Sequence, residues 1–147
     1  MPCNLADKLA KIILDEIAEL GILTEGIVYV ASQEAGRLMA REKGELREVL
    51  ERLLSDLCLK DVAIERREDV LSVEVEGRSC SLCLGREKPR TEFCPLPGLL
   101  SSYISNSTEY RLLPVRWEDG RFVKREGKKC RLKFSVRRKK KDAQHMG

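Results

Sequence analysis

The sequence has few of the residues on which most enzyme active sites depend. Its only histidine is His145, close to the end of the chain. A histidine in a charged terminal stretch is more often solvated than catalytic, so no triad with a histidine base is expected. Neither a Gly-x-x-x-x-Gly-Lys-Ser/Thr loop nor a Gly-x-Gly-x-x-Gly turn occurs, so no phosphate cradle is predicted. We therefore expect a protein that is not an enzyme.

Long hydrophobic runs and aromatic residues are also scarce. No apolar run approaches the ~20 residues that a membrane span requires, and no cleavable signal pattern is visible. We therefore expect a cytoplasmic protein with reduced cysteines and no membrane span. Aromatic residues make up only 5% of the chain, which leaves few rings for stacking on nucleic-acid bases.

The 147 residues are 42% hydrophobic and 35% charged, which is typical of one folded domain. We assign it to residues 1–136, and residues 137–147 to a basic tail. The charge is uneven: residues 1–76 hold 10 Lys or Arg and 17 Asp or Glu, whereas residues 77–147 hold 18 and 7. Such halves attract each other, or the opposite half of a second copy.

Apolar residues recur at helical spacing in three segments of the first half, which cover residues 5–20, 24–43 and 46–57. In the second segment the β-branched residues 27–30 also fit a short strand. The apolar period continues past them, so helix is favoured. Gly36 in this helix is either a contact point between helices or a mild defect costing about 1 kcal/mol.

The apolar period then changes to two, which indicates strands. Residues 61–67 and 70–76 are predicted to form an antiparallel hairpin with a turn at Glu68-Asp69. A fourth helix is expected from Gly98 to about Ser105, opened by Pro95-Leu-Pro97.

Further strands are predicted over residues 110–117, 121–124 and 130–136. Pro114 indicates an edge strand or a bulge in the first of them. On this strand Tyr110 and Trp117 are expected in the core rather than in a ligand pocket. The whole order is ααα-ββ-α-ββ(β), an α+β domain with the N-terminal helices on one face of an antiparallel sheet.

Four of the six cysteines fit a zinc site. Cys80 and Cys83 form a Cys-x-x-Cys, Cys94 ends the same segment, and Cys130 lies in the last predicted strand. Zinc binds four thiolates in a tetrahedron, and a Cys-x-x-Cys turn presents two of them at little cost in chain closure. We therefore expect a structural zinc that ties the middle of the chain to its last strand.

Three other interpretations of these cysteines remain. A redox pair normally opens a helix, which Gly85 and Pro89 make unfavourable here. Buried cysteines without a metal are common, because cysteine acts as a small hydrophobe. A disulfide framework is the weakest of these interpretations, since the chain is not a small secreted scaffold.

Two segments resemble the four-vinyl-reductase domain family, which includes predicted archaeal hydrocarbon-binding proteins. They are Cys94-Pro-Leu-Pro-Gly98 and Gly127-Lys-Lys-Cys130-Arg-Leu-Lys-Phe134. The resemblance covers roughly residues 94–136. It implies a fold shared with haem-nitric-oxide-binding domains and with subunits of a vesicle-tethering complex, often a homodimer with an apolar cavity.

The resemblance also implies that Cys94 and Cys130 match the family's zinc cysteines. The family often adds a Glu and another Cys before the last cysteine. That second Cys is absent here. We therefore expect Cys80 and Cys83 to supply the remaining zinc ligands, with Glu118 or Asp119 as substitute ligands.

The combined interpretation is a non-enzymatic module, expected to be homodimeric, that holds a structural zinc and binds an apolar small molecule or acts as a scaffold. Four protein ligands leave zinc no open position for catalysis. The alternative is a zinc-stabilised nucleic-acid-binding protein that uses the basic C-terminal half, including the run from Arg137 to Lys141.

Overall fold

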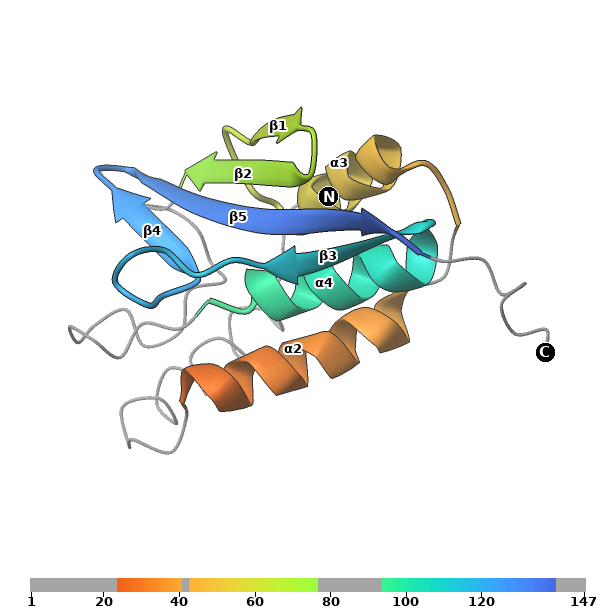
Figure 1. Ribbon diagram of the computed structural model, residues 1–147, viewed down its shortest axis with the longest axis horizontal. Helices are drawn as coiled ribbons and strands as arrows, with labels where there is room; N and C mark the ends of the chain where they lie inside the picture. The colour runs from red at the N-terminus through yellow and green to blue at the C-terminus, as the bar shows by residue number, and fades with distance from the viewer. Residues whose placement is uncertain (1–23, 41–42, 77–93, 140–147) are drawn as a thin grey trace.

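The computed structural model describes residues 24–40, 43–76 and 94–139. Over these residues three helices pack on one face of a five-stranded antiparallel sheet, which is the predicted α+β class (Figure 1). The elements are α2 (Glu25–Met39), α3 (Leu46–Asp56), β1 (Ala63–Arg67), β2 (Val70–Glu76), α4 (Leu96–Ser107), β3 (Tyr110–Pro114), β4 (Val123–Glu126) and β5 (Lys129–Arg138). The described order is α-α-β-β-α-β-β-β rather than one beginning ααα, and the helix predicted over 5–20 lies outside the described residues.

The sheet is built around β5, its longest strand. β2 pairs along one edge of β5, while β3 and β4 pair with successive parts of the other edge, so the order is β1-β2-β5-β3 with β4 beside β5. The predicted β1–β2 hairpin is confirmed, with Glu68 in the left-handed conformation (φ 52°) that its tight turn requires. Pro114 lies on β3, whose only partner among the described strands is β5, as an edge position requires.

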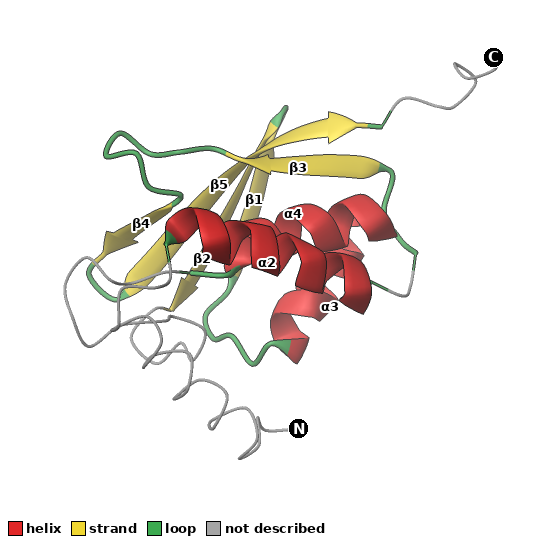
Figure 2. Cartoon of the chain, turned by 90° about the horizontal axis from the view of Figure 1, so that it is seen from below, coloured by secondary structure: helices red, strands yellow, loops and turns green. Residues whose placement is uncertain are grey.

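The core lies between the sheet and the helices because alternate strand residues face the same way. Leu132, Phe134 and Val136 of β5 are buried on the helix side, opposite Leu71 and Val73 of β2. Helix α4 lies between the sheet and α2, and Figure 2 shows α2 nearest the viewer with the sheet at the back. No described element covers the other face of the sheet (Figure 1).

Helices α2 and α4 approach closely through glycines. A Cβ on Gly36 would lie 2.7 Å from the backbone oxygen of Leu99, and one on Gly98 would lie 2.4 Å from that of Tyr29. Gly36 is therefore a contact point between helices, the first of its two predicted roles. Thr24 is the N-cap of α2, since Ile27 N donates to Thr24 Oγ1 at 3.1 Å, and residues 27–30 are helical as predicted.

Several boundaries differ from the prediction. Helix α2 ends at Met39 rather than near Lys43. β3 ends at Pro114 rather than at residue 117, and one further hydrogen bond to β5, from Val115 N to Lys133 O at 2.8 Å, follows before the chain leaves the sheet. β5 extends to Arg138, so the first two residues of the predicted tail pair with Tyr110 and Arg111. Among the described residues no helix is long and apolar enough to cross a membrane.

Candidate functional site

Cys94 and Cys130 lie on the same side of the sheet. Cys130 alternates with Leu132 and Phe134 on β5, so it shares their helix-facing side. Cys94 lies two residues before α4, the helix that covers this side. Both cysteines are half-buried and pack against the main hydrophobic core. The structure thus places two of the predicted zinc ligands on one side of the sheet, next to one core.

Cys80 and Cys83, the other two predicted ligands, lie outside the described residues. The last described residue before them is Glu76 at the end of β2, which pairs with Lys129, the neighbour of Cys130. The next described residue after them is Cys94.

Glu118 and Asp119 are not brought together with these cysteines. Within residues 24–40, 43–76 and 94–139, no three His, Cys, Asp or Glu side chains are grouped as metal ligands. Asp119 instead accepts a hydrogen bond from Arg121 N at 2.9 Å in an exposed turn. Cys58, which follows α3, is disulfide-bonded, so the expectation of reduced cysteines is wrong for this residue, and neither Cys94 nor Cys130 is its partner.

A groove of 280 Å³ lies between α3 and the start of β1. Its apolar lining consists of Leu54, Leu59, Val62 and Ile64. Two exposed charged residues of α3 line it as well, Arg47 and Glu51, joined by an ion pair of 3.0 Å. The groove therefore combines an apolar floor with a polar rim.

Trp117 lies outside the core, contrary to the prediction, because the chain leaves the sheet after Pro114. It starts a tight turn in which Gly120 N donates to Trp117 O at 2.8 Å, with Gly120 at φ 84°. The Nζ atoms of Lys133 and Lys124 lie 4.6 and 5.1 Å from the centre of its ring. Both lysines are on the outer face of the sheet, so the half-buried indole lies there too.

The loop that carries Trp117 is fixed to α2. Arg116 forms an ion pair of 3.0 Å with Glu25, donates to Gly120 O at 2.6 Å, and lies 4.1 Å over the ring of Phe122. Phe122 in turn packs against Tyr29, with ring centres 5.4 Å apart. The indole is thus held by a helix on the opposite side of the sheet.

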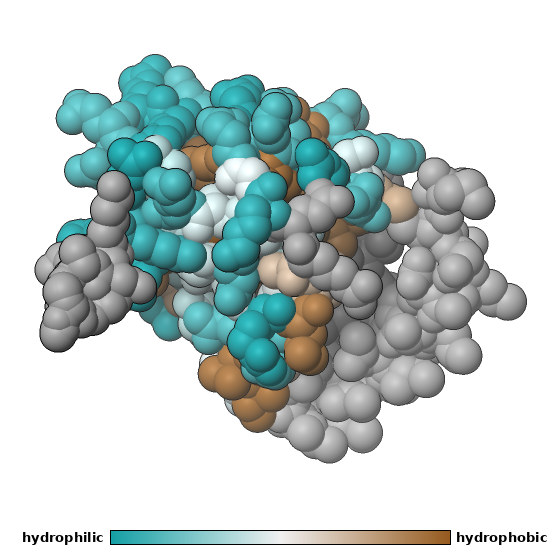
Figure 3. Space-filling view, turned by 90° about the vertical axis from the view of Figure 1, so that its right-hand side faces the viewer, coloured by the Kyte–Doolittle hydropathy of each residue, from teal (hydrophilic) through white to brown (hydrophobic). Residues whose placement is uncertain are grey.

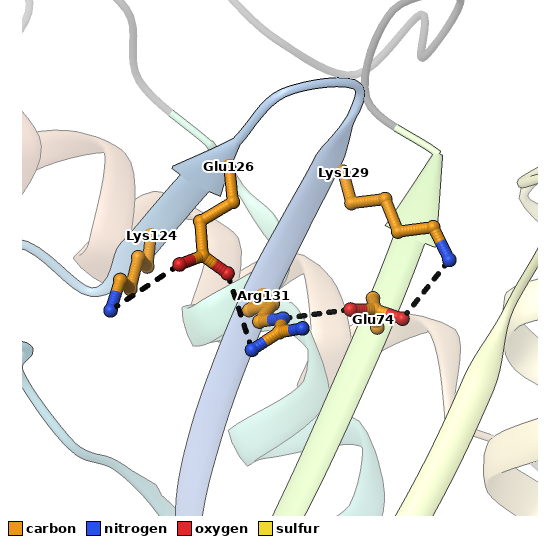
Figure 4. A network of polar contacts seen from close by, with 5 residues as sticks. All are labelled: Glu74, Lys124, Glu126, Lys129 and Arg131. Carbon is orange, nitrogen blue, oxygen red and sulfur yellow. Dashed lines mark hydrogen bonds and ion pairs between the residues drawn. The ribbon is translucent and has the colours of Figure 1, made fainter.

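A network of charged residues crosses the outer face (Figure 4). Glu74 of β2 accepts from Arg131 at 2.7 Å and from Lys129 at 3.4 Å, and Arg131 also pairs with Glu126 at 3.2 Å. Lys124 completes the network at 3.6 Å from Glu126. The hydrogen bond from Arg131, followed by that from Lys129, lowers the pKa of Glu74 below its ordinary value.

The outward side of α2 carries large apolar residues beside the exposed ion pair of Glu34 and Arg37. Ile27, Val30, Leu38 and Met39 have 51%, 64%, 61% and 43% of their surface exposed. Figure 3 looks onto the end of the molecule where α2 finishes, and hydrophobic side chains gather at the bottom of its described surface. An exposed apolar stripe of this kind is typical of protein–protein contact sites.

A comparison with curated proteins finds no match. A comparison with family models finds one family, which matches residues 21–136 and so includes every described helix and strand up to Val136 in β5. The matched range contains all four predicted zinc cysteines, the groove and the loop of Trp117. The chain therefore belongs to the MJ0207 family.

Proposed function

We propose that this chain is a non-enzymatic binding module whose fold is stabilised by a structural zinc held by Cys80, Cys83, Cys94 and Cys130. One observation carries the proposal. Cys94 and Cys130, distant in sequence, lie half-buried on the same side of the sheet, and the segment between β2 and α4 holds the other two cysteines. This is the arrangement that the resemblance to the four-vinyl-reductase family implies.

The role of the zinc in this proposal is to tie elements together. Four thiolates complete a tetrahedron, so no position remains for water or substrate. The metal joins the start of α4 to the start of β5, the central strand, and its binding free energy adds to that of folding.

The groove between α3 and β1 is the proposed ligand site. Its volume of 280 Å³ is close to the lower end of the range for small-molecule sites, and four of its seven lining residues are aliphatic. The ion pair of Arg47 and Glu51 at the rim offers hydrogen bonds to a polar end of the ligand. The expected ligand is therefore a small, mostly apolar molecule with one polar group.

A second copy of the chain is the proposed partner of α2. A two-fold axis places the same stripe on both sides of an interface, so the apolar residues of one helix meet those of the other. Glu34 and Arg37 lie on this helix with opposite charges, and an antiparallel pair of α2 helices brings opposite charges across the axis. The module is thus proposed to be a homodimer.

Metal analysis of protein purified without chelator tests the zinc site. We expect about one zinc per chain, and loss of that zinc with a lower unfolding temperature in Cys94→Ser and in Cys130→Ser. Glu118→Gln and Asp119→Asn are the matched controls, and both should keep the metal. A zinc content below about 0.3 per chain in the unmodified protein would contradict the proposal.

A further inference from the structure

The outer face of the sheet, which no described element covers, is rich in cations. Arg131, Lys133 and Arg137 of β5 alternate with the buried residues and so face away from the core. The register adds Lys124 beside Arg131 and Arg111 beside Arg137. The face therefore carries a row of positive charges from β4 to the start of β3.

These cations fall into two groups. Lys124, Lys129 and Arg131 are held in the network with Glu74 and Glu126. Lys133, Arg111 and Arg137 form no ion pair within the described part of the chain. Positive side chains without a carboxylate partner are available to an external anion at a lower cost, because no existing pair has to be broken.

Trp117 adds a ring to this positive surface. The ammonium groups of Lys133 and Lys124 lie over the indole, 4.6 and 5.1 Å from its centre, and are displaced when a base stacks there. The loop of Trp117 is fixed to α2 through Arg116 and Phe122. A rigidly placed aromatic ring among lysines and arginines is the combination that single-stranded nucleic acids require, since bases stack on the ring and phosphates pair with the cations.

We propose that the outer face of the sheet binds single-stranded nucleic acid, with Trp117 as the stacking residue and Lys133, Arg111 and Arg137 as phosphate contacts. The charge of the face matches a polyanion. The two exposed aliphatic residues on the same face, Val70 and Leu113, offer little area for insertion into a lipid surface. A duplex is disfavoured because its bases are stacked internally and leave Trp117 no partner.

The test uses the full chain and labelled 12-nucleotide single strands, oligo(dT) and oligo(U), at low salt. Trp117 is the only tryptophan, so its fluorescence reports on this face directly. We expect quenching on binding and an affinity that falls with salt, with a slope of about −2 for three phosphate contacts.

Substitutions separate this face from other basic regions. Lys133→Gln and Arg137→Gln should each weaken binding about fivefold at low salt and reduce the salt slope by about 0.7. Trp117→Leu, followed by anisotropy of the labelled strand, should weaken binding about tenfold with little change in slope. Arg52→Gln on α3, outside the groove and on the opposite side of the sheet, removes the same charge and should leave binding unchanged.

Four results would overturn the proposal. They are no binding at low salt, an equal loss in Arg52→Gln, loss only in a Lys140→Gln/Lys141→Gln variant of the C-terminal run, and tighter binding to anionic phosphatidylserine vesicles than to single strands. Thermal unfolding of each variant shows whether it is folded. The zinc content is measured on the same samples, so that a failure of nucleic-acid binding can be told apart from a failure of the proposed zinc site.

Discussion

At the scale of single residues, Gly98 and Gly36 decide how closely α2 and α4 pack. A side chain on Gly98 would meet the backbone oxygen of Tyr29 at 2.4 Å, and a backbone atom cannot rotate away. Gly98→Ala should therefore destabilise the protein by about 2 kcal/mol, measured by urea unfolding. Gly26→Ala in the first turn of α2 is the control, because its Cβ has room, with Thr24 Oγ1 at 3.9 Å. It should be neutral or stabilising by about 0.5 kcal/mol, and equal stabilities of the two variants would contradict the close contact.

Glu74 is the residue whose charge should matter for stability at low pH. Its pKa is lower in the folded protein than its ordinary value of 4.5, mainly through the hydrogen bond from Arg131. A lowered pKa adds stability above the unfolded value, and this stability is lost as the pH falls through the folded value. The difference in unfolding temperature between the unmodified protein and Glu74→Gln should therefore be greatest near pH 7 and shrink below about 4.5.

The control for that measurement is Glu48→Gln on α3. Glu48 is exposed and forms no ion pair with the described residues, so the substitution removes one carboxylate without breaking the network. If the difference in unfolding temperature between Glu74→Gln and the unmodified protein stayed constant from pH 7 to pH 3, the Arg131 contact would not stabilise the fold.

At the scale of elements, the loop between β3 and β4 links α2 to the outer face. Phe122 contacts both Tyr29 and Arg116, so Phe122→Ala should release the loop at a cost of about 2 kcal/mol. Trp117 should then become more mobile, seen as a red-shifted emission and a lower fluorescence anisotropy. Arg121→Ala, an exposed change in the same loop, should leave both signals unchanged. An unchanged Trp117 signal in Phe122→Ala would mean that other contacts hold the loop.

The elements were largely predictable because their apolar periods are local properties of the sequence. Every described helix and strand was expected, with errors of a few residues at the ends, and the strand predicted over residues 130–136 buries Leu132, Phe134 and Val136 by alternation. Trp117 was misplaced because an apolar residue three positions after Pro114 fits an extended strand. Only the pairing with β5 shows that the strand ends at the proline.

The site was less predictable, since it depends on contacts between distant segments. Cysteine spacing predicted a zinc site, but only the structure shows that Cys94 and Cys130 both pack against the main core. The close contact of Gly98 with α2 could not be predicted, because nothing in the sequence shows that this glycine lies against the backbone of Tyr29. The row of positive charges on the outer face could not be predicted either, because it depends on the strand order, which brings Arg111 beside Arg137.

At the scale of the whole molecule, the apolar stripe of α2 and the open sheet face point in opposite directions from the core. If two copies associate through α2, both outer faces remain exposed, and one dimer presents two cationic surfaces. Linked binding surfaces raise the apparent affinity for a strand long enough to reach both. The proposed dimer and the proposed nucleic-acid face are therefore compatible and separately testable.

Association through α2 can be tested by placing a charge in the stripe. Val30 is 64% exposed, so Val30→Lys should cost the folded monomer little while placing an unpaired charge in the dimer interface. We expect the unmodified protein to have the mass of a dimer by light scattering after gel filtration, and Val30→Lys to have that of a monomer. Leu113→Lys on the outer face, where Leu113 is 49% exposed, should remain dimeric. A monomeric mass for the unmodified protein at about 100 μM would contradict the proposed dimer, since an interface of standard size normally binds more tightly than that.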